Sequence, residues 1–493
     1  MRVALALFAA SAFLAAQTAP KRYAAPKVWD DAALAEWATP IPGINARPGH
    51  FSAKEYYAAP LDNYRAYPVY HPDREPAGYW EALQKKRPEP LIETGKLRTK
   101  AEWIAEGKRV WQEFDVPIFR LYDAESISLA RSREFIDKSG TFVERDGKLA
   151  AYRWIVTPKG VALTLVECAS CHSHYMDDGT PLPGAGFNRP VTGPIDRMIA
   201  EFNRAAFPGD SFPQMLYRQF AVPWLAGDIH EKIKAMSEAE ITAMFAAQIP
   251  GVIDRFNGST FFLTKVPDLI GVSERRYLDH SATHRHRGIG DLMRYAAMVS
   301  YADSLDFGQH RMLTDAQRVI PYRVPDDALY ALSEYIYTLR PPPNPHRFDE
   351  TAARGKRVFE KSGCAACHTP PAYTNNKLTL AAGFQLPDHH PYQPDVMPIS
   401  VGMDSALALK TRKGTGLYKI PSLKGVWYRG LYGHDGAIAS LDEWFNPARL
   451  QDDYVPGGFK GYQVERRAIK GHEFGLDLSP TDKQALIVFL KTL

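Results

Sequence analysis

The sequence predicts a mainly α-helical protein made of two similar units. The segment Glu106–Trp111 (EGKRVW) recurs as Arg354–Phe359 (RGKRVF), and Ala331–Leu339 (ALSEYIYTL) recurs as Ala485–Leu493 (ALIVFLKTL). Between each opening segment and its closing segment lies one Cys-x-x-Cys-His motif. Because three elements repeat in the same order, the pattern indicates two copies of one structural unit.

The two Cys-x-x-Cys-His motifs contain all four cysteines of the 493-residue chain. Two thiols one short turn apart form thioethers with the vinyl groups of a haem, and the following histidine binds the iron. The alternatives are a redox thiol pair, which needs no histidine, and a zinc site, which requires the two motifs to converge. The sequence therefore predicts two covalently bound haem c groups, held by Cys168, Cys171, His172, Cys364, Cys367 and His368.

The closing helices carry clear end signals. Ser479 is expected to cap the last helix, with Pro480 in its first turn and apolar residues at helical spacing behind it. The corresponding helix of the first unit is expected to begin near Asp326 and to end before the prolines at 341–343. Opening and closing helices that cross beside a haem are the plan of a class I cytochrome c, which both units resemble.

These elements divide the chain into a first cytochrome c-like domain at residues 100–340, a linker at 341–349 and a second such domain at 350–493. Residues 20–99 are rich in proline and aromatic side chains and lack helical periodicity. We expect this N-terminal extension to pack over the first domain without a core of its own.

A small β insertion is expected before the first haem motif. The Asp146-Gly147 pair stands between β-prone runs and predicts a hairpin, and a second hairpin is expected to turn at Lys159-Gly160. The second unit lacks this insertion, because its motif follows Phe359 almost directly.

Residues 1–19 have the form of a secretory signal peptide. Arg2 precedes the apolar run Val3–Ala16, and small residues follow where a signal peptidase would cut. The run is too short to span a bilayer comfortably, so we expect a periplasmic or secreted protein with no membrane span after cleavage; an uncleaved anchor is the alternative. The net charge of +4 is spread along the chain, which indicates no nucleic-acid binding.

The sixth ligand decides what each haem does, since a closed iron carries electrons and an open iron reacts with O₂ or peroxide. For the second haem, His472 is the favoured ligand because it stands between glycine and the last helix. Met397 is the alternative ligand. The competing interpretations are a loop histidine bonded to a propionate and an ordinary packing methionine. Four other side chains in this unit are further candidates: His389, His390, Met403 and His434.

Two segments of the second unit resemble a family signature. Lys419–Leu423 and Tyr432–Gly436 are similar to the Lys-Ile/Val-Pro-Ser/Thr-Leu and Tyr-x-His-Asp-Gly elements of bacterial dihaem cytochrome c peroxidases. The wider superfamily includes the MauG tryptophylquinone-forming enzymes and the rubber oxygenase RoxA. The resemblance implies a first haem that reacts with peroxide or O₂ and a second haem that relays electrons, with His434 near the second.

The chain departs from the peroxidases in three places. Tyr277 or Leu278 stands where they carry a tryptophan between the haems, and no glutamate follows before Gln317 to act as the distal acid. Asn446–Ala448 stands where their second haem takes a methionine. The missing methionine favours His472, as in the RoxA-like branch, where a late histidine is the ligand.

His284, Arg285 and His286 are the candidate catalytic residues. Peroxide cleavage needs a base to move a proton and a cation to stabilise the leaving oxygen. This segment supplies both if it folds over the first haem. The alternatives are that one histidine closes the first iron, that His284 and His286 hold zinc, or that the loop is a solvated or propionate-binding segment.

The sequence thus predicts a periplasmic dihaem c-type cytochrome that is a peroxidase-like oxidoreductase. Its expected partners are peroxide or an organic substrate, and a redox protein such as a small cytochrome or cupredoxin. The alternatives are a non-catalytic electron carrier and a haem relay subunit of a larger respiratory complex. A calcium ion between the domains, known in the peroxidases, would be a further cofactor, although no motif for it is visible.

Overall fold

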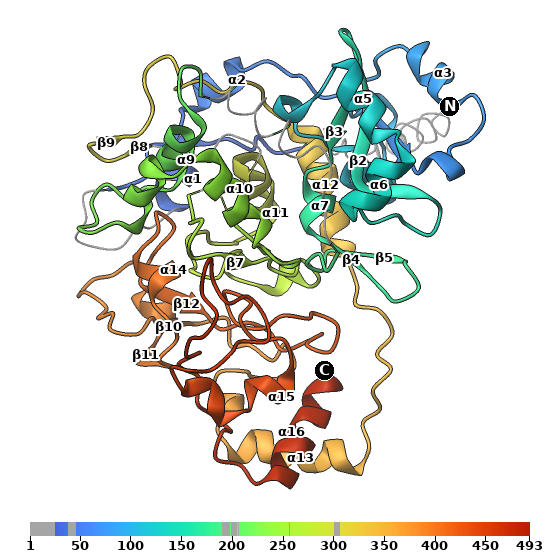
Figure 1. The fold of residues 1–493 in the computed structure, drawn as a ribbon. Coiled ribbons are helices and arrows are strands. Elements are labelled where there is room, and N and C mark those ends of the chain that lie inside the picture. The colour runs from blue at the N-terminus through green and yellow to red at the C-terminus, as the bar shows by residue number, and fades with distance from the viewer. Residues whose placement is uncertain are drawn as a thin grey trace, which may run out of the picture.

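The computed structural model describes residues 25–37, 46–189, 207–255, 257–299 and 306–493, together with positions 198 and 205. The expected signal peptide, residues 1–19, lies outside this part of the chain. The two units lie one above the other in Figure 1, joined by a segment that runs along one side of the molecule from α12 to α13. None of the helices in the described ranges has the length and apolar character needed to cross a membrane.

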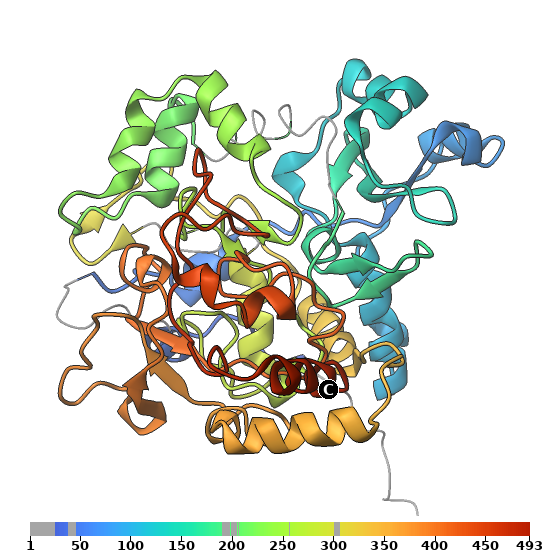
Figure 2. The ribbon, with the colours of Figure 1, turned by 60° about the horizontal axis from the view of Figure 1, so that its bottom comes forward.

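Each unit is organised around a pair of packed helices. In the first unit α4 (Lys100–Glu113) packs against α12 (Asp326–Thr338), and in the second α13 (Glu350–Lys361) packs against α16 (Pro480–Lys491). Figure 2 shows α13 and α16 side by side at the bottom of the molecule. Ser479 caps α16 as predicted, because its side chain accepts a hydrogen bond from a backbone N–H in the first turn.

The repeated glycine meets the repeated alanine in both units. A Cβ atom on Gly107 of α4 would overlap the carbonyl group of Ala331 in α12, and one on Gly355 of α13 would overlap that of Ala485 in α16. The close approach of each helix pair therefore depends on a residue without a side chain. The internal repeat of the sequence thus corresponds to the same glycine–alanine contact between two helices in both units.

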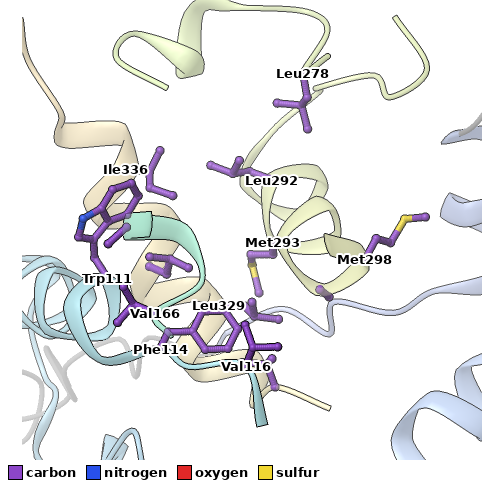
Figure 3. Packing of buried hydrophobic residues seen from close by; sticks show 14 of the residues in the cluster. Trp111, Phe114, Val116, Val166, Leu278, Leu292, Met293, Met298, Leu329 and Ile336 are labelled. Atoms are coloured by element: carbon purple, nitrogen blue, oxygen red, sulfur yellow. The ribbon is translucent and has the colours of Figure 1, made fainter. Parts of the chain in front are cut away.

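The largest hydrophobic core lies in the first unit, between α4, α12 and α11 (Ile289–Ala297). Figure 3 shows Trp111 of α4 beside Ile336 of α12, and Phe114, which follows α4 directly, beside Leu329 of α12. Further elements that the structure describes in this unit are η3 (Pro117–Phe119), α5 (Ala124–Ala130), α6 (Arg133–Ser139), α7 (Cys168–Cys171), β4 (Ser173–Tyr175), β5 (Pro181–Pro183), α9 (Phe212–Phe220), η4 (Ile229–Ala235), α10 (Glu238–Ala246), β6 (Val252–Ile253), β7 (Thr264–Lys265), η5 (Val272–Glu274), β8 (Asp306–Phe307) and β9 (His310–Arg311).

The N-terminal region packs on the first unit. Trp29 and Tyr56 stack with ring centroids 4.5 Å apart and belong to the same hydrophobic core as α4 and α12. Glu55 reaches Arg318 of the first unit at 2.8 Å. The elements of this region are short: α1 (Asp31–Trp37), α2 (Ala53–Ala58), β1 (Ala66–Tyr70), η1 (Pro72–Arg74), α3 (Tyr79–Gln84) and η2 (Thr94–Lys96).

The β insertion is one hairpin extended by a strand from the N-terminal region. β2 (Lys148–Thr157) and β3 (Gly160–Leu165) are antiparallel, and Thr157 pairs with Gly160 across a two-residue turn. This is the second of the two expected hairpins. The expected hairpin at Asp146-Gly147 is reduced to a tight turn, because only one bridge forms beyond it. β1 pairs with β2 on the other side, a contact that no sequence pattern predicted.

The second unit is mostly irregular chain around its two long helices. β10 (Leu378–Leu380) is flanked by β11 (Val396–Ser400) and β12 (Leu417–Lys419) in a small sheet. The described residues therefore form a helical protein with small sheets, more mixed than the expected mainly α fold. The remaining elements of this unit are η7 (Cys364–Ala366), η8 (Gln393–Asp395), α14 (Ala406–Leu409), α15 (Leu441–Trp444) and η9 (Pro447–Leu450).

Candidate functional site

Both Cys-x-x-Cys-His motifs fold into the same short turn. In each, the histidine N–H donates to the carbonyl of the first cysteine, at 3.0 Å in the motif of α7 and 2.9 Å in the motif of η7. Each turn follows the opening region of its unit and brings two thiols and one imidazole onto five consecutive residues. That is the local arrangement that attachment to one haem requires.

The alternative zinc site finds no support in the described residues. No two of the four cysteines are joined by a disulfide. Within the ranges given above, no group of three or more His, Cys, Asp or Glu side chains is arranged to hold a metal ion. The two motifs therefore do not converge on a zinc site, and a zinc ion at His284 and His286 has no third ligand there. Calcium stays a prediction.

The second motif lines a cavity of about 240 Å³ with mostly apolar walls. Cys364, Cys367 and His368 contribute to one side, and His472 enters from the loop before α16. The rings of His368 and His472 lie with centroids 6.2 Å apart. The Nδ1–H of His368 donates to the Pro421 carbonyl at 3.1 Å, which leaves Nε2 as the nitrogen with a lone pair.

The space between these two imidazoles has the size that one iron needs. Two imidazole nitrogens bound to the same iron at about 2 Å place their ring centroids about 6.4 Å apart. Burial lowers the pKa of His368 and lowers that of His472 to about 4, so both rings are neutral at pH 7. The thiols, the facing neutral imidazoles and the apolar walls therefore fit a haem c.

The position of His472 is fixed by its backbone. Its N–H donates to the Val401 carbonyl at 2.6 Å, and its own carbonyl accepts a hydrogen bond from Arg449 at 2.9 Å. A Cβ atom on Gly471 would overlap the backbone of Gly402, so glycine is required where this loop crosses the Val401 segment. His472 itself has a φ of 48°. The glycine next to His472 therefore allows the loop to bring the imidazole into the cavity.

Met397 and His434 lie near the same cavity in other roles. The sulfur of Met397 is 3.6 Å from the Cys367 sulfur and accepts a hydrogen bond from Asn375 at 3.2 Å. The ring of His434 packs on Tyr418 with centroids 4.6 Å apart, and both line the cavity. Of the predicted ligands, His472 is the one whose ring faces His368.

His172 of the first motif is also held as a neutral imidazole. Burial lowers its pKa to about 4; Asp268 opposes this shift and Arg255 adds to it. Its carbonyl accepts a hydrogen bond from the Gly184 N–H at 2.7 Å. The neutral form of histidine is the one that binds iron. The protonation state of His172, like that of His368, therefore suits an iron ligand.

His284 forms a buried pair with Asp279. The His284 Nδ1–H donates to the Asp279 carboxylate at 2.8 Å, and the ring packs edge-on against Tyr295 at 5.1 Å between centroids. Although burial raises the pKa of the Asp279 carboxyl, His284 and Arg255 lower it more, so the carboxyl is ionised. A carboxylate at Nδ1 sets the tautomer and orientation of the imidazole.

The other two candidates are placed differently. Both ring nitrogens of His286 are hydrogen bonded, one to the Arg275 carbonyl and one to the Tyr337 hydroxyl, each at 2.7 Å. The guanidinium of Arg285 lies 4.3 Å from the ring centroid of Tyr392 in the second unit. The three consecutive side chains therefore have different partners, and His284 is the one paired with a buried carboxylate.

Asp254 and Arg255 are site residues that the sequence did not indicate. Burial raises the pKa of Asp254 to about 7, and its charge acts on the thiol of Cys171. The charge of Arg255 acts on both His172 and His284. The family resemblance places the distal acid after Arg275, and an isolated Asp-Arg pair earlier in the chain forms no recognisable motif.

Comparison with known proteins gives a partial match. No family model matches the chain. The methylamine utilization protein MauG of Methylorubrum extorquens is 28% identical over 146 residues, covering 29% of this chain and 34% of MauG. The uncharacterized protein y4iM of Sinorhizobium fredii is 28% identical over 148 residues, covering 24% of this chain and 34% of that protein. The chain thus spans about a third of the length of these curated relatives, and over that part it is similar in sequence to MauG.

Two solved structures show a weaker likeness. Hydrazine synthase of Kuenenia stuttgartiensis has a TM-score of 0.30 and 16% identity, covering 57% of this chain and 86% of that chain. A MauG-like protein associated with microbial copper homeostasis has a TM-score of 0.30 and 17% identity, covering 58% and 89%. A TM-score this low shows no shared fold.

Proposed function

We propose that the protein is a dihaem c-type cytochrome with peroxidase-like or oxygenase-like oxidoreductase activity. The observation that carries the proposal is the pair of facing imidazoles, His368 and His472, beside a motif whose turn recurs at His172. The partial match to MauG supports the same class of protein. Each unit would hold one haem in a cytochrome c-like arrangement.

The two haem sites would have different roles, one in electron transfer and one in the reaction with the oxidant. A haem supplies an iron that exchanges electrons and, where one axial position is open, also reacts with peroxide or O₂. In the second unit, His368 and His472 would both hold the haem iron, so that this site would relay electrons. The reactive site would then be the one at His172.

The residues around His172 would handle protons for that site. Asp279 holds the Nδ1–H of His284, and this pair would take up a proton during the reaction with peroxide. Asp254, with its pKa raised by burial to about 7, would exchange protons at neutral pH. Arg255 would supply positive charge near both His172 and His284.

We further propose a periplasmic location and a redox partner. The N-terminal segment has the form of an export signal, and c-type haem is attached outside the cytoplasm. A small cytochrome or cupredoxin would exchange electrons at the second site. Peroxide or O₂ would be the oxidant, with an organic or protein substrate as the electron source in the oxygenase-like case.

A non-catalytic electron carrier is the second candidate. A haem iron held by two histidines, as His368 and His472 would hold it, is typical of carriers, and the first unit would need a second iron ligand of its own. In that case a further buried side chain of the first unit, such as His284, would bind the iron. The chain would then serve as a relay, alone or within a larger respiratory complex.

Titration of the holoprotein with peroxide separates the two candidates. Intact mass and a haem assay first establish two haems per chain. The enzyme proposal expects one high-spin haem in the electron paramagnetic resonance spectrum, whose signal and absorption change with one equivalent of peroxide. Two low-spin haems that peroxide leaves unchanged, in both the oxidised and the half-reduced protein, would make the chain a carrier.

A further inference from the structure

The haem cavity of the second unit is completed by residues of the first. Lys265 and His280 line it together with Lys419 and Arg429 of the second unit. The same four residues line a smaller cavity of about 70 Å³ at the seam, meaning the contact surface between the units, whereas the two cysteines line only the larger cavity. The cationic cluster therefore lies at the seam end of the haem cavity.

The two lysines of this cluster have ammonium N–H groups that donate no hydrogen bond to the residues that the structure describes. The ammonium of Lys419 donates to the backbone carbonyls of Tyr277 at 3.2 Å and Leu278 at 3.0 Å, which leaves one N–H. The ammonium of Lys265 has no hydrogen bond or ion pair to any residue that the structure describes. Lys265 is nevertheless anchored, because its backbone N–H donates to the His434 carbonyl at 2.8 Å.

The carboxylates near the two lysines already accept hydrogen bonds from other side chains. The Asp268 carboxylate accepts hydrogen bonds from Arg429 at 2.7 Å and from the Tyr428 hydroxyl at 3.0 Å, and Asp279 holds His284. Burial, and then the charge of Arg429, lower the pKa of Lys265 to about 8. Burial, and then the charge of Arg275, lower that of Lys419 to about 7. Buried cations of this kind are stable when an anion joins them.

We propose that Lys265 and Lys419 bind the two carboxylates of the second haem, so that this haem joins the two units. The inference rests on the proposed function, because it takes the group attached at Cys364 and Cys367 to be a haem. A haem held through its vinyl groups presents its two propionates at another edge of the ring. The cavity has thiols on its walls and ammonium groups at its seam end, which matches these two kinds of attachment.

Binding of the propionates by the two lysines would change the reduction potential of the second haem iron. An ammonium beside a propionate removes negative charge near the iron and so favours its reduced form. Lys265 comes from the first unit, so separation of the units would remove one of the two cations. The reduction potential of the second haem would then report the contact between the units.

The test is a redox titration of the second haem in the holoprotein, with four single variants. Lys265→Gln and Lys419→Gln should each shift its reduction equilibrium at least tenfold toward the oxidised form, which is about 59 mV for one electron. Lys265→Arg keeps the charge and should stay near the parent value. Lys377→Gln is the matched control, because Lys377 is exposed and lines only the smaller cavity.

Cleavage of the linker gives a second measurement. Limited proteolysis within residues 341–349 should be faster for Lys265→Gln than for Lys377→Gln if the haem joins the units. If Lys419→Gln does not fold, the Lys265 variants decide alone, since Lys419, unlike Lys265, donates side-chain hydrogen bonds to the Tyr277 and Leu278 carbonyls.

Three results would overturn the proposal. One is a potential for Lys265→Gln equal to that of Lys377→Gln. Another is a potential that changes with inorganic phosphate in place of chloride, which would assign the cluster to a free anion. The third is equal proteolysis of the two variants. A haem assay of the parent protein and of each variant separates this proposal from the proposed function. Fewer than two haems per chain in the parent protein would refute the proposed function itself.

Discussion

His368 and His472 face each other across the cavity of the second unit, with ring centroids 6.2 Å apart. One imidazole belongs to the haem motif, and the other comes from a glycine-flanked loop held by Val401 and Arg449. The two loops thus hold the rings at the spacing that one iron needs without relying on contact between the rings.

Replacement of His472 should open the second haem. In His472→Ala the low-spin signal of this haem should become high-spin, while the haem stays attached through Cys364 and Cys367. Electron paramagnetic resonance of the oxidised protein measures the change. His389→Ala alters an exposed histidine of the same unit and should leave the spectrum unchanged; an unchanged spectrum in His472→Ala would instead remove His472 from the ligand set.

Substitution of Gly355, where α13 packs against α16, should destabilise the protein. Gly355→Ala places a Cβ atom against the carbonyl of Ala485, and overpacking of this kind costs about 1–3 kcal/mol. Urea unfolding of the holoprotein measures the loss. Gly95→Ala is the control, because a Cβ atom there meets no atom within 4 Å. Equal stability of both variants would show that α13 and α16 do not depend on the close approach.

The contact of the N-terminal region with the first unit should depend on pH. The backbone N–H of Ser52, and then Arg318, lower the pKa of Glu55 from 4.5 to about 2. A lowered pKa in the folded state stabilises the protein above the unfolded value of 4.5 and loses this effect as the pH falls toward 2.

Glu55→Gln should therefore lower the free energy of unfolding by about 0.5–1 kcal/mol at pH 7, a small value because the side chain is exposed. The difference from the parent should close as the pH is lowered through this window. Unfolding at pH 7, 4 and 3 measures it. Glu81→Gln, a change at another exposed helix start, should show no such trend, and a difference for Glu55→Gln that persists at pH 3 would argue against this assignment.

Loss of the carboxylate behind His284 should slow the reaction with peroxide. Asp279→Asn keeps the shape of the side chain but no longer fixes the Nδ1–H tautomer, so the rate should fall tenfold or more. Stopped-flow absorption measures the rate, with haem content and the spectrum of the second haem unchanged. Asp315→Asn, at an exposed acid, should retain the parent rate. A parent-like rate in Asp279→Asn would place proton transfer elsewhere.

Local sequence signals predicted the elements whose determinants are local. The cap at Ser479 depends on residues within one helical turn, and the repeat of Gly107 and Gly355 is visible as identical short motifs. His472 was also indicated by its place between glycine and the last helix, although the sequence left open a loop histidine bonded to a propionate.

The features that the sequence did not predict arise between distant segments. β1 has no alternating pattern of its own and forms as a strand because β2 offers it an edge. Lys265 contributes to a cavity whose cysteines lie about a hundred residues later. The pKa of Asp254 is raised by its burial in the folded protein. Contacts of this kind depend on the tertiary structure and leave no motif.

The most direct test of the account is near-infrared magnetic circular dichroism of the oxidised holoprotein. The charge-transfer band of a low-spin haem in this region distinguishes two imidazole ligands from one imidazole and one thioether. We predict the band of a bis-imidazole haem, lost in His472→Ala. A histidine–methionine band from the second haem would contradict the pairing of His368 with His472 and would assign the sixth position to a methionine such as Met397.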